Sequence, residues 1–228
     1  MLSSLSASAQ PLPPVTVVTP GENSQVISPI EVLARVHPGE DGLLRLTLVD
    51  RSGDLLARQL VRVDAPGEST VEFFSQLAFE IPKETNTGIL TVMTQDHNHR
   101  PVALRSVNVT LARDGEAIIE PQTSPEPWLT VTHPEPGMVI QSSPLLVIGT
   151  VTPINDFPLI FELLTERGGA IISKQLAVET PGQPMNFEVP LVYPPVTGGH
   201  DMRLIIRQPS GWVGVDAILD SVPITIAP

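Results

Sequence analysis

The chain has 228 residues, of which 41% are hydrophobic and 17% charged, a composition typical of a globular protein. Its formal net charge of −12 and its 13 lysines and arginines argue against a nucleic-acid partner and against adsorption to an anionic membrane surface. The absence of cysteine excludes disulfides, thiolate metal ligands and a cysteine nucleophile. A membrane-spanning helix needs a run of about 18 apolar residues, and no run in the sequence is close to that length. We therefore expect no membrane insertion.

The N-terminal segment, residues 1–14, is rich in Ser, Ala and Pro and lacks the apolar stretch of a signal peptide. Ala7-Ser8-Ala9 nevertheless has the form of a signal-peptide cleavage site. We therefore expect residues 1–14 to be either a disordered N-terminus or the remnant of a signal sequence.

The first half of the chain contains short apolar runs between turn signals, without a sustained helical period. A Gly-containing hairpin connection at 50–54 separates two of these runs. Turn signals about every 8–12 residues are typical of an antiparallel β-sandwich, which we predict over residues 15–111. The expected strands are 15–18, 30–36, 43–50, 55–63, 71–79, 89–95 and 102–111.

Residues 112–127 differ in composition from what precedes and follows them. Three prolines favour an extended conformation, and acidic side chains such as Asp114, Glu116 and Glu120 repel one another. Calcium at a domain junction would use such oxygens, but the segment has no dense run of ligands. The composition favours a semi-rigid spacer without a bound metal.

The second half repeats the strand pattern of the first, with a Gly-Gly hairpin connection at 168–169. We predict a second sandwich over residues 128–228. Its expected strands are 129–132, 145–151, 159–165, 170–178, 185–192, 202–208 and 215–226.

The two halves are also related in sequence. The Ser28-Pro29 pair returns as Ser143-Pro144, a separation of 115 positions (144 − 29). The segment 104–107, LRSV, returns as 219–222, LDSV, at the same separation (221 − 106). This period is too long for a solenoid repeat of roughly 20–50 residues and has the size of a small domain. The sequence therefore predicts an all-β protein made of two tandem immunoglobulin-like antiparallel β-sandwiches.

The segment 143–151, SPLLVIGTV, and its counterpart 28–36, SPIEVLARV, resemble the immunoglobulin-like domain attached to bacterial spore-germination proteins. Ala34 stands where that family has a glycine. The resemblance extends over nearly all of both units. It implies an extracytoplasmic β-sandwich that serves as an interaction or spacer module, with no catalytic residues to transfer.

One candidate contact site is the polar turn 96–100, DHNHR, between the last two strands of the first unit. Asp96, His97 and His99 carry groups that ligate transition metals. Because successive strand side chains point to opposite faces, the two imidazoles would converge only if the turn bends sharply. We therefore favour a solvated turn over a metal site, and we predict no metal or other cofactor.

The corresponding turn of the second unit, 208–214, carries Gly211 and Trp212. An exposed Trp is enriched in contact surfaces because it combines apolar area with a hydrogen-bond donor. The alternative is that the indole folds back over the end of the sandwich.

The sequence contains no G-x-S-x-G nucleophile elbow and no P-loop, and we predict that the protein is not an enzyme. We expect an extracytoplasmic interaction or spacer module of a bacterial cell-surface or envelope assembly. Its partner would be a protein or an envelope polysaccharide. The alternative is a carbohydrate-binding module that uses Trp212 and Tyr193 as stacking residues. The predicted contact residues are Trp212, Gly211, Asp96, His97 and His99.

Overall fold

The computed structural model describes residues 14–63, 70–82, 84–120, 122, 128–195 and 199–227. All regular secondary structure in these ranges is β-strand, sixteen strands in total, which confirms the all-β prediction. Within these ranges there is no helix long and apolar enough to cross a membrane. Residues 1–13 of the predicted N-terminal segment and most of 121–127 lie outside the described residues.

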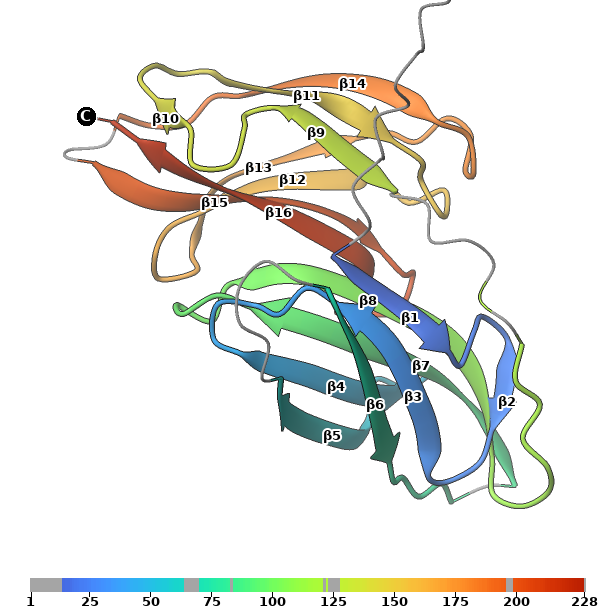
Figure 1. The fold of residues 1–228 in the computed structure, drawn as a ribbon. Helices are drawn as coiled ribbons and strands as arrows, with labels where there is room; N and C mark the ends of the chain where they lie inside the picture. The colour runs from blue at the N-terminus through green and yellow to red at the C-terminus, as the bar shows by residue number, and fades with distance from the viewer. Residues whose placement is uncertain are drawn as a thin grey trace, which may run out of the picture.

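The first half of the chain forms a sandwich of two antiparallel sheets (Figure 1). The smaller sheet has the order β1-β3-β6, and the larger one continues through β8, β7, β4 and β5. The short β2 pairs in parallel with β8. This strand order, with the first strand split between the two sheets, is that of an immunoglobulin-like sandwich. The strands are β1 (Val15–Thr19), β2 (Ser24–Val26), β3 (Ile30–Val36), β4 (Leu43–Asp50), β5 (Leu55–Arg62), β6 (Val71–Leu77), β7 (Thr85–Gln95) and β8 (Pro101–Ala112).

The second half repeats this topology strand for strand. Its smaller sheet has the order β14-β11-β9, its larger sheet runs β13-β12-β15-β16, and the short β10 pairs in parallel with β16. The strands are β9 (Leu129–His133), β10 (Val139–Ile140), β11 (Leu145–Val151), β12 (Leu159–Leu164), β13 (Ala170–Leu176), β14 (Met185–Leu191), β15 (His200–Pro209) and β16 (Asp216–Ile226).

Alternation along the strands builds a separate core in each half. In β3, Val32, Ala34 and Val36 are fully buried, whereas Glu31 and Arg35 face solvent. The first-half core is formed mainly by Val, Leu and Ile side chains, and the second-half core adds an edge-to-face pair of Phe161 and Phe187 with ring centroids 5.3 Å apart. Each sandwich therefore buries its own apolar faces.

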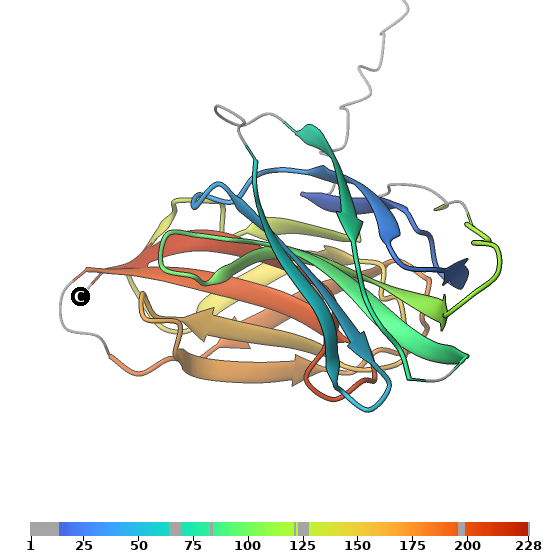
Figure 2. The same cartoon turned by 90° about the horizontal axis from the view of Figure 1, so that it is seen from below.

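The larger sheets of the two halves join into one. Strand β16 pairs antiparallel with β8, so the sheet runs β13-β12-β15-β16-β8-β7-β4-β5. Figures 1 and 2 both show β8 and β16 side by side where the halves meet. Leu104 lies directly opposite Leu219. These two residues are equivalent in the repeat (219 − 104 = 115), so the pairing has a local two-fold symmetry centred on them.

The start of the segment predicted as a spacer packs on the first half. Gln25 and Ile118 exchange two backbone hydrogen bonds of 2.8 Å, and the backbone N–H of Glu120 donates to Ser24 Oγ at 3.0 Å. Residues 116–120 therefore lie along β2 and do not extend away from the sandwich.

Candidate functional site

The turn 96–100 connects β7 to β8, and the side chain of its first residue, Asp96, accepts hydrogen bonds from later residues of the turn. Asp96 Oδ1 accepts hydrogen bonds from the backbone N–H groups of Asn98 and Arg100, both at 2.9 Å. Its Oδ2 accepts from Arg100 Nε at 2.7 Å. His99 adopts a left-handed backbone conformation, with φ of 61°, which reverses the chain. The turn is thus a compact unit built around the Asp96 carboxylate.

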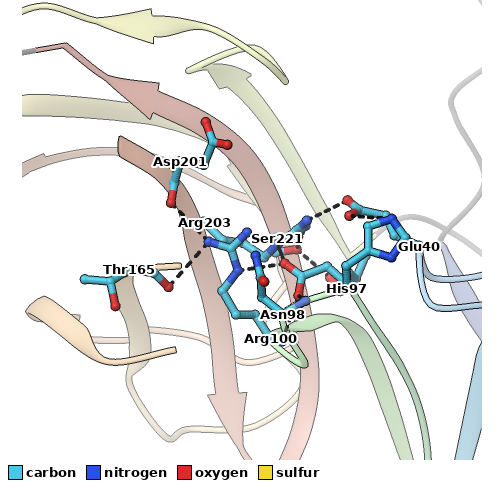
Figure 3. A network of polar contacts seen from close by, with 10 residues as sticks. Glu40, His97, Asn98, Arg100, Thr165, Asp201, Arg203 and Ser221 are labelled. Atoms are coloured by element: carbon cyan, nitrogen blue, oxygen red, sulfur yellow. Dashed lines mark hydrogen bonds and ion pairs between the residues drawn. The ribbon is translucent and has the colours of Figure 1, made fainter. Parts of the chain in front are cut away.

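Arg203, on β15 of the second half, binds this turn (Figure 3). Its Nε donates to Asp96 Oδ2 at 2.9 Å, its Nη2 donates to Glu40 Oε1 at 2.9 Å, and its Nη1 donates to Ser221 Oγ at 3.0 Å. The side chains of Arg203 and Asp96 are only 3% and 1% exposed. The contact therefore joins the two halves through a buried ion pair.

Arg100 extends the same junction by donating from Nη1 to the backbone oxygens of Thr165 and Asp201, at 3.4 and 3.3 Å (Figure 3). Burial raises the pKa of Asp96, but hydrogen bonds from Arg100 and the positive charges of Arg203 and Arg100 outweigh it and hold the pKa below its ordinary value. The carboxylate is therefore ionised and compensated at neutral pH. We name Asp96, Arg100, Arg203 and Glu40 the junction network.

The structure corrects the expectation of a solvated Asp96. This side chain is buried because two arginines satisfy it, so it has no surface to offer a partner. His97 and His99 are exposed, and His97 Nε2 lies 3.9 Å from Glu40 Oε2. No three His, Asp or Glu side chains among the described residues are arranged to hold a metal ion.

The turn of the second unit has a different character. Ser210 N–H donates to the Val215 carbonyl at 3.0 Å, and Ser210 Oγ accepts from the backbone N–H of Trp212 at 3.1 Å. Gly211 has a φ of 84°, which a residue with a side chain rarely adopts. Val213 at the tip is 97% exposed and Trp212 is half-buried.

A neighbouring loop, 152–158, is braced against this turn by Gln208, which is fully buried. Gln208 Oε1 accepts from Ile154 N–H at 2.8 Å, and its Nε2 donates to the carbonyls of Asn155 and Phe157, both at 2.9 Å. Asn155 Nδ2 in turn donates to the Pro209 carbonyl at 2.7 Å. One buried amide side chain therefore fixes the backbone of the loop, as a satisfied internal polar group does.

Apolar side chains gather on these two segments. Ile154 and Phe157 are 40% and 41% exposed. The Phe157 ring lies against Gly211, where an added Cβ would come within 2.8 Å of Phe157 Cε2. We name Ile154, Phe157, Trp212 and Val213 the loop platform.

Two further aromatic residues, Tyr193 and Trp128, lie inside the second sandwich. Tyr193 is 6% exposed and belongs to the core. Trp128 is 5% exposed, and its Nε1 donates to Asp220 Oδ2 at 2.8 Å. Burial raises the pKa of Asp220 to about 7, although the Trp128 hydrogen bond and the charge of Arg105 oppose the rise. Tyr193 is therefore not placed to stack on a sugar.

No protein-family model matches the chain, and no curated protein matches it. Among solved structures, it is similar to the fibronectin(III)-like modules of Clostridium thermocellum CbhA, with 13% identity, 93% of each chain covered and a TM-score of 0.26. It is also similar to the Salmonella enterica SafA pilin in complex with the SafB chaperone, with 8% identity, 96% and 99% coverage and a TM-score of 0.31. The calcium binding domain CBD12 of CALX1.1 has 11% identity, 86% and 82% coverage and a TM-score of 0.25. Since these TM-scores are low, the fold assignment rests on the strand order described above.

Proposed function

We propose that the protein is a non-enzymatic interaction module and that the loop platform is its contact surface. The observation that carries this proposal is the exposure of Ile154, Phe157 and Val213 beside the half-buried Trp212, on two loops of which one is held in place by a buried glutamine. Exposed apolar side chains on neighbouring loops are typical of a contact site. Loops on a rigid β scaffold are the usual position for such sites.

The composition of the loop platform also fits a contact surface. Trp212 and Phe157 offer large apolar areas with few rotatable bonds, so that ordering them on binding costs little entropy. Gln208 and Asn155 fix the backbone before a partner arrives, which lowers the cost further. Aromatic anchors of this kind dominate the binding energy of protein interfaces.

We further propose that the partner is a protein and that the module works outside the cytoplasm, in a bacterial cell-surface or envelope assembly. The resemblance of 28–36 and 143–151 to the immunoglobulin-like domain of spore-germination proteins supports this location. So does the Ala7-Ser8-Ala9 sequence. An envelope polysaccharide is the alternative partner, for which Trp212 and Phe157 would be the stacking residues.

The test measures how tightly the Trp212→Ala variant binds to isolated bacterial envelopes that have been separated into a protein fraction and a polysaccharide fraction. If Trp212 is a contact, the variant keeps its thermal stability and loses about 2 kcal/mol or more of binding free energy. Phe74→Ala is the matched control, because Phe74 is an aromatic residue 60% exposed on β6 of the other sandwich.

Two outcomes separate the candidate functions. Val213→Ser weakens binding to a protein partner, which contacts aliphatic surface, but leaves sugar stacking unchanged. A loss of about 3–5 kcal/mol of stability in Trp212→Ala would instead place the indole in the core and contradict the proposal.

A further inference from the structure

We infer that the two halves of this chain, residues 14–120 and 128–227, recognise each other as a non-covalent pair, and that charged residues at their junction permit only the pairing of a first half with a second half. The partner surface offered by each half is thus specific for the other half, whether from the same chain or from a second copy.

The backbone at the junction has the symmetry of a homodimer interface. Leu104 of β8 faces Leu219 of β16, and the two are equivalent in the repeat. The equivalent serines each donate across the junction, Ser106 Oγ to the Asp216 carbonyl at 2.7 Å and Ser221 Oγ to the Val102 carbonyl at 2.8 Å. An interface in which equivalent patches meet around a two-fold axis is isologous, the usual form in dimers.

The apolar part of the junction is independent of the two sandwich cores. Leu219 packs in a cluster with Leu164 and Ile205 of the second half, and Leu104 of the first half packs against that cluster. Leu219 and Ile205 are only 3% and 1% exposed. The chain therefore buries apolar surface between two bodies that each have a core of their own.

The ionisable side chains beside the central pair break this symmetry. Arg105 and Asp220 are equivalent in the repeat, and each lies one residue beyond the central Leu104–Leu219 pair. They are diagonal neighbours on one face of the paired strands, close enough to interact. Two first halves paired in this way would bring together two Arg105 side chains, and two second halves would bring together two Asp220 side chains.

The junction network adds a second asymmetry. Leu90 pairs with Val107 in the first half, and Leu204 pairs with Val222 in the second, so Ile89 is the equivalent of Arg203. Two paired first halves would therefore present Ile89 to Asp96 in place of Arg203.

A pair of two second halves is disfavoured because Arg203 would lack an acidic partner. Arg203 would meet the turn 210–215, SGWVGV, which has no carboxylate. A buried charge that loses its partner is strongly destabilising, so both homotypic pairs are disfavoured relative to the observed one.

The experiment places a specific protease site within 121–127, cuts the purified full chain and examines the cut protein by size-exclusion chromatography and native mass spectrometry. We expect the cut protein to elute as the intact chain does at micromolar concentration, and we expect only pairs of one first half with one second half. Separate elution of the halves would overturn the inference. Homotypic pairs above trace level would overturn its specificity.

Arg203→Met tests the part played by the charges, with intact variants first compared by circular dichroism to establish that they fold. In the cut protein this variant should raise the dissociation constant of the two halves at least about tenfold. Arg35→Met is the matched control, since Arg35 forms an exposed ion pair on the outer sheet of the first sandwich. An unchanged dissociation constant in Arg203→Met, or an equal rise in Arg35→Met, would contradict the role assigned to the junction network.

Discussion

Arg203 and Asp96 are 107 positions apart in sequence, yet Arg203 Nε lies 2.9 Å from Asp96 Oδ2 and both side chains are almost completely buried. Because burial removes solvent screening and each group is bound by the other, the pair depends on both members. The contact fixes how the first sandwich meets the second. The position of each half relative to the other is thus set by side chains far from the connecting segment.

Removal of one partner should show how much this contact contributes to the free energy of unfolding. Arg203→Met keeps most of the side-chain volume and leaves the Asp96 carboxylate with one arginine fewer. We expect a loss of about 3 kcal/mol in the free energy of unfolding, measured with urea. Arg35→Met should change the same quantity by less than about 0.5 kcal/mol, because its ion pair is exposed.

Asp220 should make stability depend on pH near neutrality. Its pKa is raised from the ordinary 3.8 to about 7, so the fold favours the protonated carboxyl. This contribution to stability is complete below the unfolded pKa and is lost as the pH rises through the folded value. We expect the melting temperature to fall between about pH 4 and about pH 7 in the wild type and to change less in Asp220→Asn.

Trp128 provides a direct optical measurement of the same titration. In Trp212→Phe, Trp128 is the remaining tryptophan, and its indole donates to Asp220. Its emission should titrate near pH 7, and Asp220→Asn should abolish the transition. A flat profile in Trp212→Phe would show that Asp220 keeps an ordinary pKa. The lowered pKa of Asp96 has its effect at acidic pH. The stability that the ionised Asp96 carboxylate contributes is lost only as the pH falls below about 4.

Gln208→Leu should loosen the loop platform without exposing the core. The substitution removes the hydrogen bonds to Ile154, Asn155 and Phe157. We expect a loss of about 2–3 kcal/mol and faster hydrogen exchange at the Ile154 N–H, because buried backbone groups lose their partner. Gln175→Leu, at an exposed position of β13, should leave both measurements unchanged.

Substitutions of two glycines in the turn 210–215 distinguish the cost of backbone strain from the cost of a steric clash. Gly211 and Gly214 both have a positive φ, 84° and 74°, but only at Gly211 would a new Cβ meet another side chain, the Phe157 ring. Gly214→Ala should therefore cost about 1 kcal/mol of stability through strain alone. Gly211→Ala should cost more and displace Phe157, visible as a shift of the ring resonances by NMR. Equal costs for the two variants would show that Phe157 does not pack on Gly211.

Strand positions could be predicted closely because alternation and turn residues are local signals. The predicted bounds of β3, β4 and β11 agree with the structure residue for residue. Strands β2 and β10 were missed because runs of three and two residues carry no periodicity. The docking of 116–120 on β2 was missed because the proline and acidic composition concealed the pairing of Ile118 with Gln25.

The candidate site was predicted only in part. Gly211 and Trp212 stood out as an exposed turn with a large aromatic, and the structure adds Phe157 and Ile154 beside them. The bracing role of Gln208 had no sequence signal, because its partners lie more than 50 positions away. The burial of Asp96 could not be anticipated for the same reason, although the repeated LRSV and LDSV segments marked the strands that pair across the junction.

A fixed junction between the two sandwiches is the claim on which the account depends most. The chain has no cysteine, so Gln76→Cys on β6 and Glu188→Cys on β14, both at exposed positions, give a unique pair of spin labels. Double electron–electron resonance on the full chain should show one narrow distance distribution, which broadens in Arg203→Met. A broad or multimodal distribution in the otherwise unaltered chain would show that the halves move independently and would contradict the account.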